Sequence, residues 1–569
     1  MRSGHGLPYH DRVKSCPTCG AACADDDDFC EADGTKLARP GGASGPSSAS
    51  KSSPPPAPAP TAAGACDACG ADAADDGDGY CRVCGHKLAR RASVEHGRGA
   101  LTTGMKLGSY MVRQTSGDRA TASSPDGTEV LLVVGEPEAL AAEAEALGRI
   151  GDHRSFPHVV DRDDDPTGAF LALEAPAWSA QMLSDVVHGR TVDQTLAAIG
   201  ALLALAGLVE HAGFTFQPSP SDLLLAPDGA VLLSRLRGSR RLQPGDRLDA
   251  RRLLESLAEI FLAPAILGPA SLIRLLVPSR VTAGPAGRSI DDMLAALALV
   301  RAEHALPPGR GSLAEVCDPG LWRPYNQDAT AVDHGVTKAG EPFVVMVVCD
   351  GVSSSAFSDR ASRVAARAAR DALAHFARSP DLTHETAGSA VAMAIRAAHL
   401  AICAEHVADP VADPPGTTIA AAFIFRKRLT VGWVGDSRGY WLTVRGAEQL
   451  THDHSWVNEA IARGEVKDAD EVQGALAHTI TKCLGPLEVG DVPAEIEPDV
   501  RSRDLAGPGL VLLCSDGLWN YAPKPNDIAA VIRAAGEGSN AVEVARVLVN
   551  YALARGGQDN VSVAVYAHA

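Results

Sequence analysis

Four aspartates in the C-terminal half of the chain share a sequence context that suits metal-ion chemistry. Each lies at the edge of an apolar run, beside glycine or a small residue: Asp350 in "VVCDG", Asp436 in "VGDSRGY", Asp516 in "LLCSDG" and Asp559 in "GGQDNVS". One such aspartate is usually a turn residue. Four together favour a hard-cation site, because packed like charges need a metal to offset their repulsion. Carboxylates without nearby His or Cys indicate Mg²⁺ or Mn²⁺ rather than zinc.

Cysteines near the N-terminus have the spacing of a different metal site. Two CxxC pairs that can wrap one tetrahedral Zn²⁺ are supplied by Cys66, Cys69, Cys81 and Cys84. An earlier copy places Cys16, Cys19 and Cys30 at equivalent positions, with Asp33 at the fourth and Cys23 as a spare thiol that could substitute. A redox role is the alternative, but these segments are too small for a redox-enzyme fold. Roughly 20 residues cannot build a core without metal, so we expect structural zinc. Both copies resemble the bacterial zinc-ribbon family.

Composition limits the class of protein. A chain of 569 residues is too long for one core, and 46% apolar with 21% charged residues is globular. The net charge of -18 argues against a nucleic-acid partner and against docking on an anionic membrane. The sequence shows no signal-peptide core and no uninterrupted apolar run of about 18 residues. Five of the 13 cysteines are scattered singly, which suits a reducing compartment. We therefore expect a soluble, cytoplasmic protein without membrane insertion, and the resemblance to bacterial zinc ribbons implies a bacterial source.

Composition changes along the chain, and these changes predict several domains. We place one ribbon at 14–38 and a second at 64–90, joined by a linker at 39–63 that is rich in Pro, Ser and Ala. Such a linker cannot bury enough apolar surface to fold, so we expect it to be disordered. Two larger globular domains follow, at 106–300 and 313–569.

The segment 106–300 begins with strands joined by an Asp-Gly turn, continues with an amphipathic helix and is then mostly helical. This order resembles a bacterial serine/threonine protein kinase, with Glu143 as the ion-pairing glutamate and Asp246 at the start of a large-lobe helix. The chemistry expected from the resemblance is missing. Val133, Gln217 and Ser234 stand where the ATP-binding lysine, the catalytic aspartate and the metal-binding aspartate belong. We predict a degenerate, inactive kinase-like α+β domain; an unrelated α+β domain is the alternative.

In the C-terminal domain, apolar runs that end in Asp-Gly or Gly-Asp predict β-strands, with two helical stretches between the first two strands. The predicted strands are Phe343–Cys349, Ile419–Phe425, Leu429–Val434, Leu510–Cys514 and Val561–Tyr566. The motifs "RPYNQDA", "VVCDGVSSS", "GTTIAAAFI", "VGDSRGYW", "LTHDHSW", "ITKCLG", "LLCSDGLW" and "GGQDNVSVAVY" occur in this order. They resemble the metal-dependent type 2C protein phosphatase family over Leu313–Ala569. The resemblance implies a four-layer αββα sandwich, with two antiparallel sheets between helices and a two-metal centre at one end.

The resemblance also implies roles for individual residues. Asp350 would bridge two Mn²⁺ or Mg²⁺ ions, and the Gly351 carbonyl would bind one of them. Asp516 and Asp559 would complete the other site. Asp436 matches the aspartate associated with a third, more weakly held metal ion.

Two further residues carry catalytic roles in this resemblance. Arg323 would grip the substrate phosphate, and Asp328 would orient a water whose pKa two divalent ions lower. The family often has a histidine after Asp-Gly, but this chain has Val352 followed by Ser353–Ser355. The general acid for the leaving group is therefore unassigned, and the serines are interpreted as an altered wall of the substrate entrance. We interpret His452 and His454 as structural.

These features lead to one principal hypothesis and two alternatives. The principal one is hydrolysis of phosphoserine and phosphothreonine on proteins, with the ribbons and the kinase-like domain as regulatory or docking modules. In this view the ribbons bind a protein partner. The first alternative is a catalytically weak signalling scaffold that binds phosphoproteins. The second is metal-dependent hydrolysis of small phosphate esters or phosphodiesters.

Overall fold

The computed structural model describes residues 13–15, 22–24 and 101–569, with gaps in the last range. The gaps are 165–168, 176–179, 187–188, 278, 280–287, 307–310, 381, 409–412, 469–470, 473–475, 477–478, 487–494, 535 and 537–539. The chain divides into two units, Met1–Thr102 and Thr103–Ala569. In the first unit, strands β1 (Val13–Ser15) and β2 (Ala22–Ala24) pair antiparallel. The predicted linker and most of both ribbons lie outside the described residues.

The second unit begins with an antiparallel six-stranded sheet, ordered β3-β4-β5-β6-β8-β7. Its strands are β3 (Lys106–Leu107), β4 (Tyr110–Ser116), β5 (Arg119–Ser123), β6 (Glu129–Val134), β7 (Val159–Asp163) and β8 (Phe170–Glu174). The predicted Asp-Gly turn joins β5 to β6, and Gly127 adopts the positive φ of 90° that such a turn requires. Helix α1 (Pro137–Ile150) is the predicted amphipathic helix and buries Leu140 and Leu147. The expected strands and helix are therefore confirmed.

The remainder of the central domain is helical, apart from short strand pairs. Its helices are α2 (Val192–His211), α3 (Ala250–Ser256), α4 (Ala258–Ala265), α5 (Ala270–Leu276) and α6 (Ile290–His304). Three of the short strands form one sheet, ordered β12-β11-β9: β9 (Gln181–Met182), β11 (Leu223–Leu225) and β12 (Val231–Leu233). Strand β10 (Phe214–Thr215) pairs separately with β13 (Arg240–Arg241).

The expected helix start at Asp246 is wrong. Helix α3 begins at Ala250, because the Asp249 carboxylate accepts the Arg252 amide hydrogen bond and caps the helix there. Asp246 lies in the preceding turn, where its amide bonds to the Gln243 carbonyl at 2.9 Å.

The C-terminal domain contains two five-stranded antiparallel sheets packed face to face. One is ordered β14-β23-β22-β19-β20, from Leu313–Asp318, Val561–His568, Gly509–Cys514, Arg438–Thr443 and Gly446–Gln449. The other is ordered β15-β16-β17-β18-β21, from Ala329–Val336, Pro342–Cys349, Ile419–Phe425, Arg428–Val434 and Asp499–Asp504. All five predicted strands are confirmed within one or two residues.

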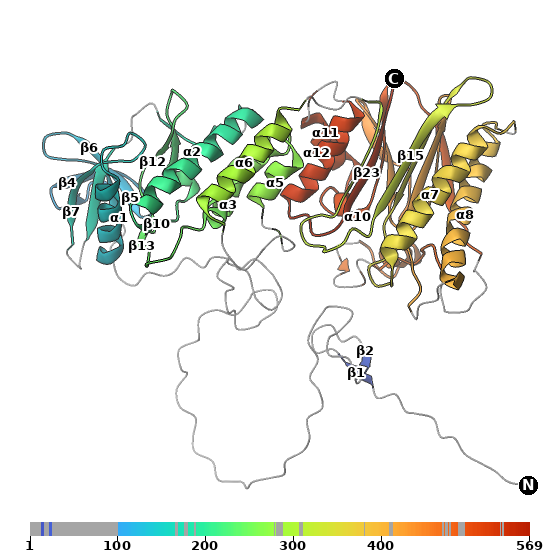
Figure 1. Ribbon diagram of the computed structural model, residues 1–569, viewed down its shortest axis with the longest axis horizontal. Helices are drawn as coiled ribbons and strands as arrows, with labels where there is room; N and C mark the ends of the chain where they lie inside the picture. Colours follow the sequence, from blue (N-terminus) through green and yellow to red (C-terminus); the bar gives the residue numbers. More distant parts are fainter. Residues whose placement is uncertain are drawn as a thin grey trace, which may run out of the picture. The chain divides into compact units, whose positions relative to one another are not determined.

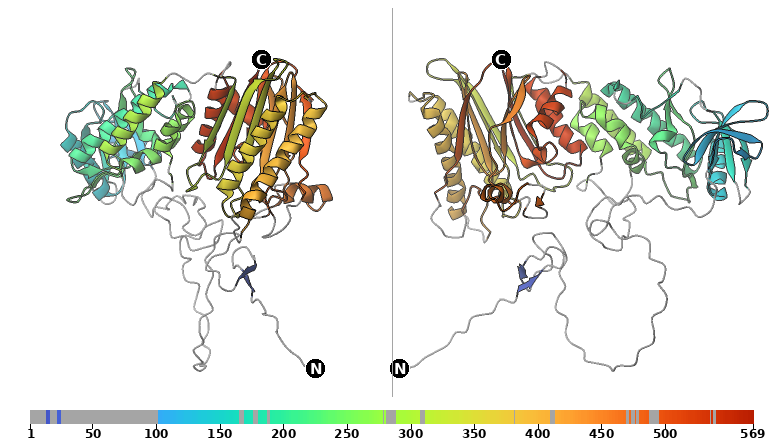
Figure 2. Two further views of the ribbon diagram at one scale, coloured as in Figure 1. Left: turned by 45° about the vertical axis from the view of Figure 1, so that its right-hand side comes forward. Right: turned by 180° about the vertical axis from the view of Figure 1, so that it is seen from behind.

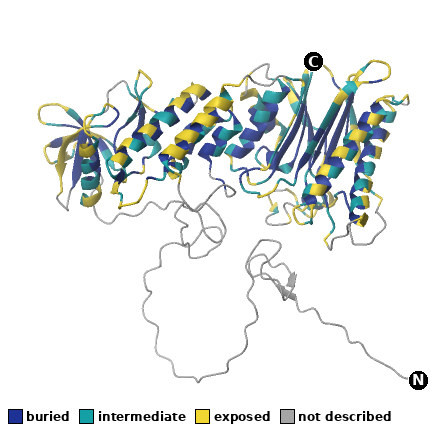
Figure 3. Ribbon diagram, in the orientation of Figure 1, coloured by how far each residue is buried: buried dark blue, intermediate teal, exposed yellow. Residues whose placement is uncertain are grey.

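Helices cover the outer face of each sheet, as expected for four layers. Helices α7 (Ser358–Ala377) and α8 (Thr386–Ala408) lie side by side on the sheet that contains β15 (Figures 1 and 2). Helices α11 (Pro525–Ala534) and α12 (Ala541–Ala554) cover the other sheet. In Figure 3 the strands are mostly buried, and the helices expose only their outer faces. The predicted α+β sandwich is confirmed.

The buried face of α7 is formed mainly by alanines around Leu373. Val364 and Ala368 are only partly buried, whereas Ala365, Ala369 and Leu373 are completely buried. Alanines without bulk allow the helix to approach the sheet closely, so the smallest side chains face inward. On α8 the side chains of Val391, Ile395, Ala398 and Ile402 are all buried.

Helices α2 and α8 are long and apolar enough, by length and composition alone, to cross a membrane. Half of the most apolar window of each helix is buried inside the fold. Core helices of globular domains meet the same criterion, so this is weak evidence for a membrane span. Helix α2 begins at Val192, where Thr191 and Gln194 form a capping box.

Candidate active site

Strand register brings the predicted aspartates to one end of the sandwich. Ala329, the first residue of β15, pairs with Cys349, the last residue of β16. Asp328 therefore directly precedes β15 at the same edge of the sheet where Asp350 directly follows β16. Cys514 and Val563 pair in the same way across β22 and β23. Asp516 therefore follows the end of β22 at the edge where Asp559 precedes β23. Because adjacent strands of an antiparallel sheet run in opposite directions, the end of one strand lies beside the start of its neighbour at the same edge of the sheet.

The backbone of Asp350 is fixed by two threonines. Its amide donates to Thr418 Oγ1 at 3.1 Å, and its carbonyl accepts from the Thr417 hydroxyl and the Thr418 amide, each at 2.8 Å. The Thr418 hydroxyl also lies 2.7 Å from Ser437 Oγ, next to Asp436. The two threonines thus position the aspartate-bearing strand ends relative to one another.

The aspartates form a cluster in which only Asp328 is fully buried and like charges oppose ionisation. Burial, followed by the charges of neighbouring aspartates, holds the pKa of Asp350 well above its usual value. Burial is also the largest cause that raises the pKa of Asp516 to about 6, of Asp328 to about 7 and of Asp436 to about 8. The charge of Asp559 contributes to the rises at Asp516, Asp328 and Asp350. A divalent cation would remove this repulsion.

The donor set matches a hard divalent cation. It is made of carboxylates, and the buried Oδ2 of Asp328 has no hydrogen-bond partner in the described part of the chain. Within those same residues, no three His, Cys, Asp or Glu side chains are arranged as they stand to ligate one ion. Asp559 instead accepts a hydrogen bond from Arg323 at 2.8 Å. The residues therefore fit the cation chemically, and their side chains would have to rotate to enclose it.

Two glycines allow the backbone around the aspartates to pack tightly. A Cβ at Gly351 would lie 2.5 Å from the Gln327 carbonyl oxygen. A Cβ at Gly517 would lie 1.9 Å from the carbonyl oxygen of Asn560. Any side chain at either position would push apart the strand ends that carry Asp350, Asp516 and Asp559.

Asn560 is a site residue that sequence reasoning missed, although it follows Asp559 in the quoted motif. Its Nδ2 donates to the carbonyls of Pro319 at 2.9 Å and Tyr325 at 3.1 Å. Its Oδ1 accepts the Gln327 amide at 2.8 Å. Asn560 therefore fastens both ends of the loop that carries Arg323. The only available signal was an Asn beside the motif aspartate, because its partners are more than 200 residues away.

His454 fits its predicted structural role. Its Nδ1 accepts the Gly435 amide at 3.0 Å, and Nε2 lies 2.9 Å from Asp499 Oδ2. Burial lowers the pKa of the imidazole, so the neutral ring holds the glycine that precedes Asp436. Cys349 and Cys514 are completely buried, and burial raises the pKa of both thiols. These cysteines are core residues.

The three serines after Val352 form a turn. Ser353 and Ser354 are exposed. Ser355 Oγ donates to the Val352 carbonyl at 2.8 Å and accepts the Gly416 amide at 3.0 Å. The substrate-entrance role of these residues stays a prediction.

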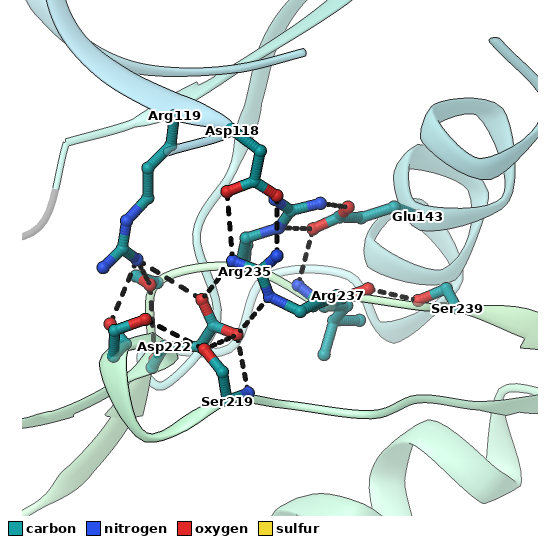
Figure 4. A network of polar contacts seen from close by, with 11 residues as sticks. Asp118, Arg119, Glu143, Ser219, Asp222, Arg235, Arg237 and Ser239 are labelled. Carbon is teal, nitrogen blue, oxygen red and sulfur yellow. Dashed lines mark hydrogen bonds and ion pairs between the residues drawn. The ribbon is translucent and has the colours of Figure 1, made fainter. Parts of the chain in front are cut away.

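In the central domain, Glu143 belongs to a network of ion pairs and hydrogen bonds (Figure 4). Glu143 is buried and accepts from Arg235 at 2.7 and 3.1 Å, where a kinase would offer a lysine. Asp118 accepts from Arg235 at 2.9 Å and from Arg237 at 2.6 Å. Asp222 accepts from Arg237 at 2.8 Å. Arg119 of β5 also donates to Asp222, at 3.3 Å, so that three arginines balance three carboxylates.

The positions predicted to have lost their chemistry lie around this network. Val133 is completely buried in the apolar core. Ser234 is buried and donates to the Asp222 carbonyl at 3.3 Å. The Gln217 amide donates to the Arg237 carbonyl at 2.8 Å. The kinase-like assignment stays a prediction. All eight predicted zinc ligands lie outside the described residues, so the ribbons stay predictions as well.

Comparisons with known proteins agree on the C-terminal domain. Residues 341–561 match the family model described as protein phosphatase 2C. The serine/threonine phosphatase stp of Listeria welshimeri is 28% identical over 246 residues, which cover 43% of this chain and 91% of that protein. The serine/threonine protein phosphatase PstP of Mycobacterium tuberculosis is 29% identical over 251 residues, covering 44% and 43% of the two chains.

Solved structures of bacterial phosphatases also match this part of the chain. The crystal structure of the Mycobacterium tuberculosis phosphatase PstP/Ppp shares 28% sequence identity, covers 44% of this chain and 96% of that one, and has a TM-score of 0.37. Another solved structure, of the PstP catalytic domain in complex with two manganese ions, shares 27% identity, covers 45% and 98% of the two chains, and has a TM-score of 0.36. By the family model and the two relatives compared above, residues 341–561 are a serine/threonine protein phosphatase domain of the protein phosphatase 2C family.

Proposed function

We propose that the chain hydrolyses phosphoserine and phosphothreonine on proteins in a reaction that depends on Mn²⁺ or Mg²⁺. The observation that carries this proposal is the aspartate cluster with a partly exposed arginine at its edge. The charges of four neighbouring aspartates oppose ionisation of Asp350 unless cations are present, and such a cluster has a high energetic cost in a purely structural role.

In this proposal the cations are held by side chains of the cluster. Asp350, the Gly351 carbonyl, Asp516 and Asp559 would hold two such ions. Asp436 provides a third, weaker site. When bound, the cations supply an activated water and offset the charge of the phosphate.

The protein's own groups bind and orient the reactants. The side chain of Arg323 is 37% exposed and presents a planar guanidinium that matches two phosphate oxygens. The unpartnered Oδ2 of Asp328 is an acceptor that can hold a water in one orientation. Asn560 keeps the Arg323 loop against Asp559. Phosphate and water are thus brought together at the rim of the two sheets.

The remaining modules are proposed to regulate or dock. The two ribbons hold structural zinc and bind a protein partner, and the central kinase-like domain is catalytically inactive. We place the protein in the cytoplasm, where phosphorylated substrates of serine/threonine kinases occur.

The test is manganese-dependent phosphate release from a phosphoserine or phosphothreonine peptide by the full chain. Asp350→Ala and Asp516→Ala should each abolish release. Equal activity in wild type and both variants would exclude the assigned metal ligands. A wild type that binds phosphoproteins without turnover would favour the scaffold. Hydrolysis of small phosphate esters without hydrolysis of any phosphopeptide would favour the third hypothesis.

A further inference from the structure

An arginine and a serine of the central domain form hydrogen bonds to the phosphatase domain. Arg274, on α5, donates to both carboxylate oxygens of Asp318 at 2.6 and 2.8 Å and to the Gly320 carbonyl at 3.1 Å. Ser279, just beyond α5, donates from its buried hydroxyl to the Leu321 carbonyl at 2.9 Å. Both side chains therefore bind the segment 318–321, which follows strand β14 of the phosphatase sheet.

This segment leads directly to the phosphate-binding arginine. Only Trp322 separates Leu321 from Arg323. On its other side the segment rests on the backbone next to Asp559. The Leu321 amide donates to the Gly557 carbonyl at 2.8 Å, and a Cβ at Gly320 would lie 2.2 Å from the Asp559 carbonyl oxygen. The segment is thus held between α5 and the strand start that carries a proposed metal ligand.

The hydrogen bonds of Arg274 to Asp318 fix the shape of the turn as well as pairing opposite charges. Asp318 Oδ1 accepts the Gly320 amide at 2.8 Å, so the carboxylate sets the shape of the turn. Nη2 of the guanidinium donates to both carboxylate oxygens while Nη1 donates to the Gly320 carbonyl, so one planar group holds the carboxylate and the turn together, which the single nitrogen of lysine cannot reproduce. The Asp318 side chain is 14% exposed and that of Arg274 is 35% exposed, so solvent screens this pair only in part.

We propose that Arg274 is a positioning residue for Arg323, through which the central domain controls phosphate binding in the phosphatase domain. This inference rests on the proposed function, since Arg323 has its role only in phosphate ester hydrolysis. Displacement of α5 moves Asp318–Leu321 and with it the guanidinium that meets the substrate. A domain without kinase chemistry thereby acquires a function as an intramolecular regulator.

The experiment compares Arg274→Ala with a matched control in the same interface. Arg546, on α12, donates to the Leu267 carbonyl at 2.7 Å and to the Gly268 carbonyl, just before α5. Arg546→Ala therefore removes an arginine from this contact without touching 318–321. The readouts are steady-state kinetics on a phosphopeptide with Mn²⁺, direct binding of inorganic phosphate to the manganese-loaded full chain, and thermal denaturation.

Arg274→Ala should raise KM and weaken phosphate binding about tenfold, with a smaller change in kcat, because the bound phosphate is misplaced rather than the water. Arg546→Ala should leave both values near wild type, and Arg274→Lys should fall between. In an Arg323→Ala background, Arg274→Ala should have no further effect, since it acts through that side chain.

Three outcomes would overturn the inference: unchanged phosphate binding in Arg274→Ala, equal losses in Arg274→Ala and Arg546→Ala, or an undiminished effect without Arg323. Lack of turnover by the wild type would instead overturn the proposed function. Phosphate binding is measured without turnover, so it still decides the role of Arg274 in that case.

Discussion

Arg323 donates a hydrogen bond to Asp559 Oδ2 at 2.8 Å, although 236 residues separate them in the sequence. The proposed phosphate-binding side chain thus contacts a proposed metal ligand directly. Both side chains are about one-third exposed, at 37% and 34%. In the proposed function Arg323 would bind the substrate phosphate and Asp559 a cation, so the two binding sites would share this ion pair.

Replacing Arg323 with lysine should weaken substrate binding. Lysine keeps the positive charge but loses the planar fork, so we expect KM for a phosphopeptide to rise about tenfold while kcat falls less. Initial-rate kinetics over a range of peptide concentrations measure this. Arg363→Lys, at an exposed helical pair with Asp359, is the control and should behave as wild type. A KM unaffected by Arg323→Lys would contradict the assigned role.

Replacing Asp350 with asparagine should separate activity from stability. Activity should be lost, whereas the metal-free protein should become more stable by about 1–3 kcal/mol, because one like charge is removed. Urea unfolding in EDTA gives the free energy of unfolding. Asp371→Asn is the control, since that side chain is 67% exposed on α7. Destabilisation in Asp350→Asn would argue against mutual repulsion in the cluster.

The metal-free protein should lose stability as pH rises. The folded-state pKa values of Asp516, Asp328 and Asp436 are raised to about 6, 7 and 8, so the folded state binds more protons than the unfolded state above pH 4. The free energy of unfolding therefore falls between about pH 4 and pH 8. Thermal denaturation in EDTA across this range tests the sign. Saturating Mn²⁺ should abolish the slope, and a slope that persists with metal would place its origin elsewhere.

The ion-pair network of the central domain should be sensitive to loss of one partner. Arg235→Met leaves Glu143 buried without its guanidinium and should cost about 3–5 kcal/mol of unfolding free energy. Arg154→Met removes an exposed pair with Asp228, whose side chains are 68% and 57% exposed, and should cost at most about 1 kcal/mol. Chemical denaturation compares the two. Similar costs would mean that the network in Figure 4 adds little beyond an ordinary surface pair.

The N-terminal cysteines should bind zinc. We expect about two zinc ions per chain, one for each ribbon, and loss of one after a Cys81→Ser and Cys84→Ser double substitution. Elemental analysis of the purified full chain measures this. A chain that contains no zinc would refute the ribbons, and one zinc ion would indicate that Asp33 does not replace a cysteine ligand.

The parts of the molecule that were predicted correctly depend on local pattern. Apolar runs located the strands of the phosphatase sheets, and Asp350 and Asp516 stood out at the ends of such runs. Interactions between distant segments were not predictable in this way. Arg274 and Asp318 are 44 residues apart, and Asn560 contacts Pro319 across 241 residues. The start of α3 was misplaced because Asp246 and Asp249 are both possible helix caps, and it is Asp249 that accepts the Arg252 amide hydrogen bond.

The buried apolar cluster that contains Leu276 of α5 also contains Leu548 of α12. It continues without a break from the central domain into the helical layer of the phosphatase, and Asn550 of α12 donates to the Gly268 carbonyl at 2.9 Å within it. Two domains that share one core unfold together, so heating should give a single cooperative transition. The lifetime of the phosphatase in the cell then depends on the sequence of its catalytically silent neighbour, because a destabilised central domain brings the enzyme to degradation with it.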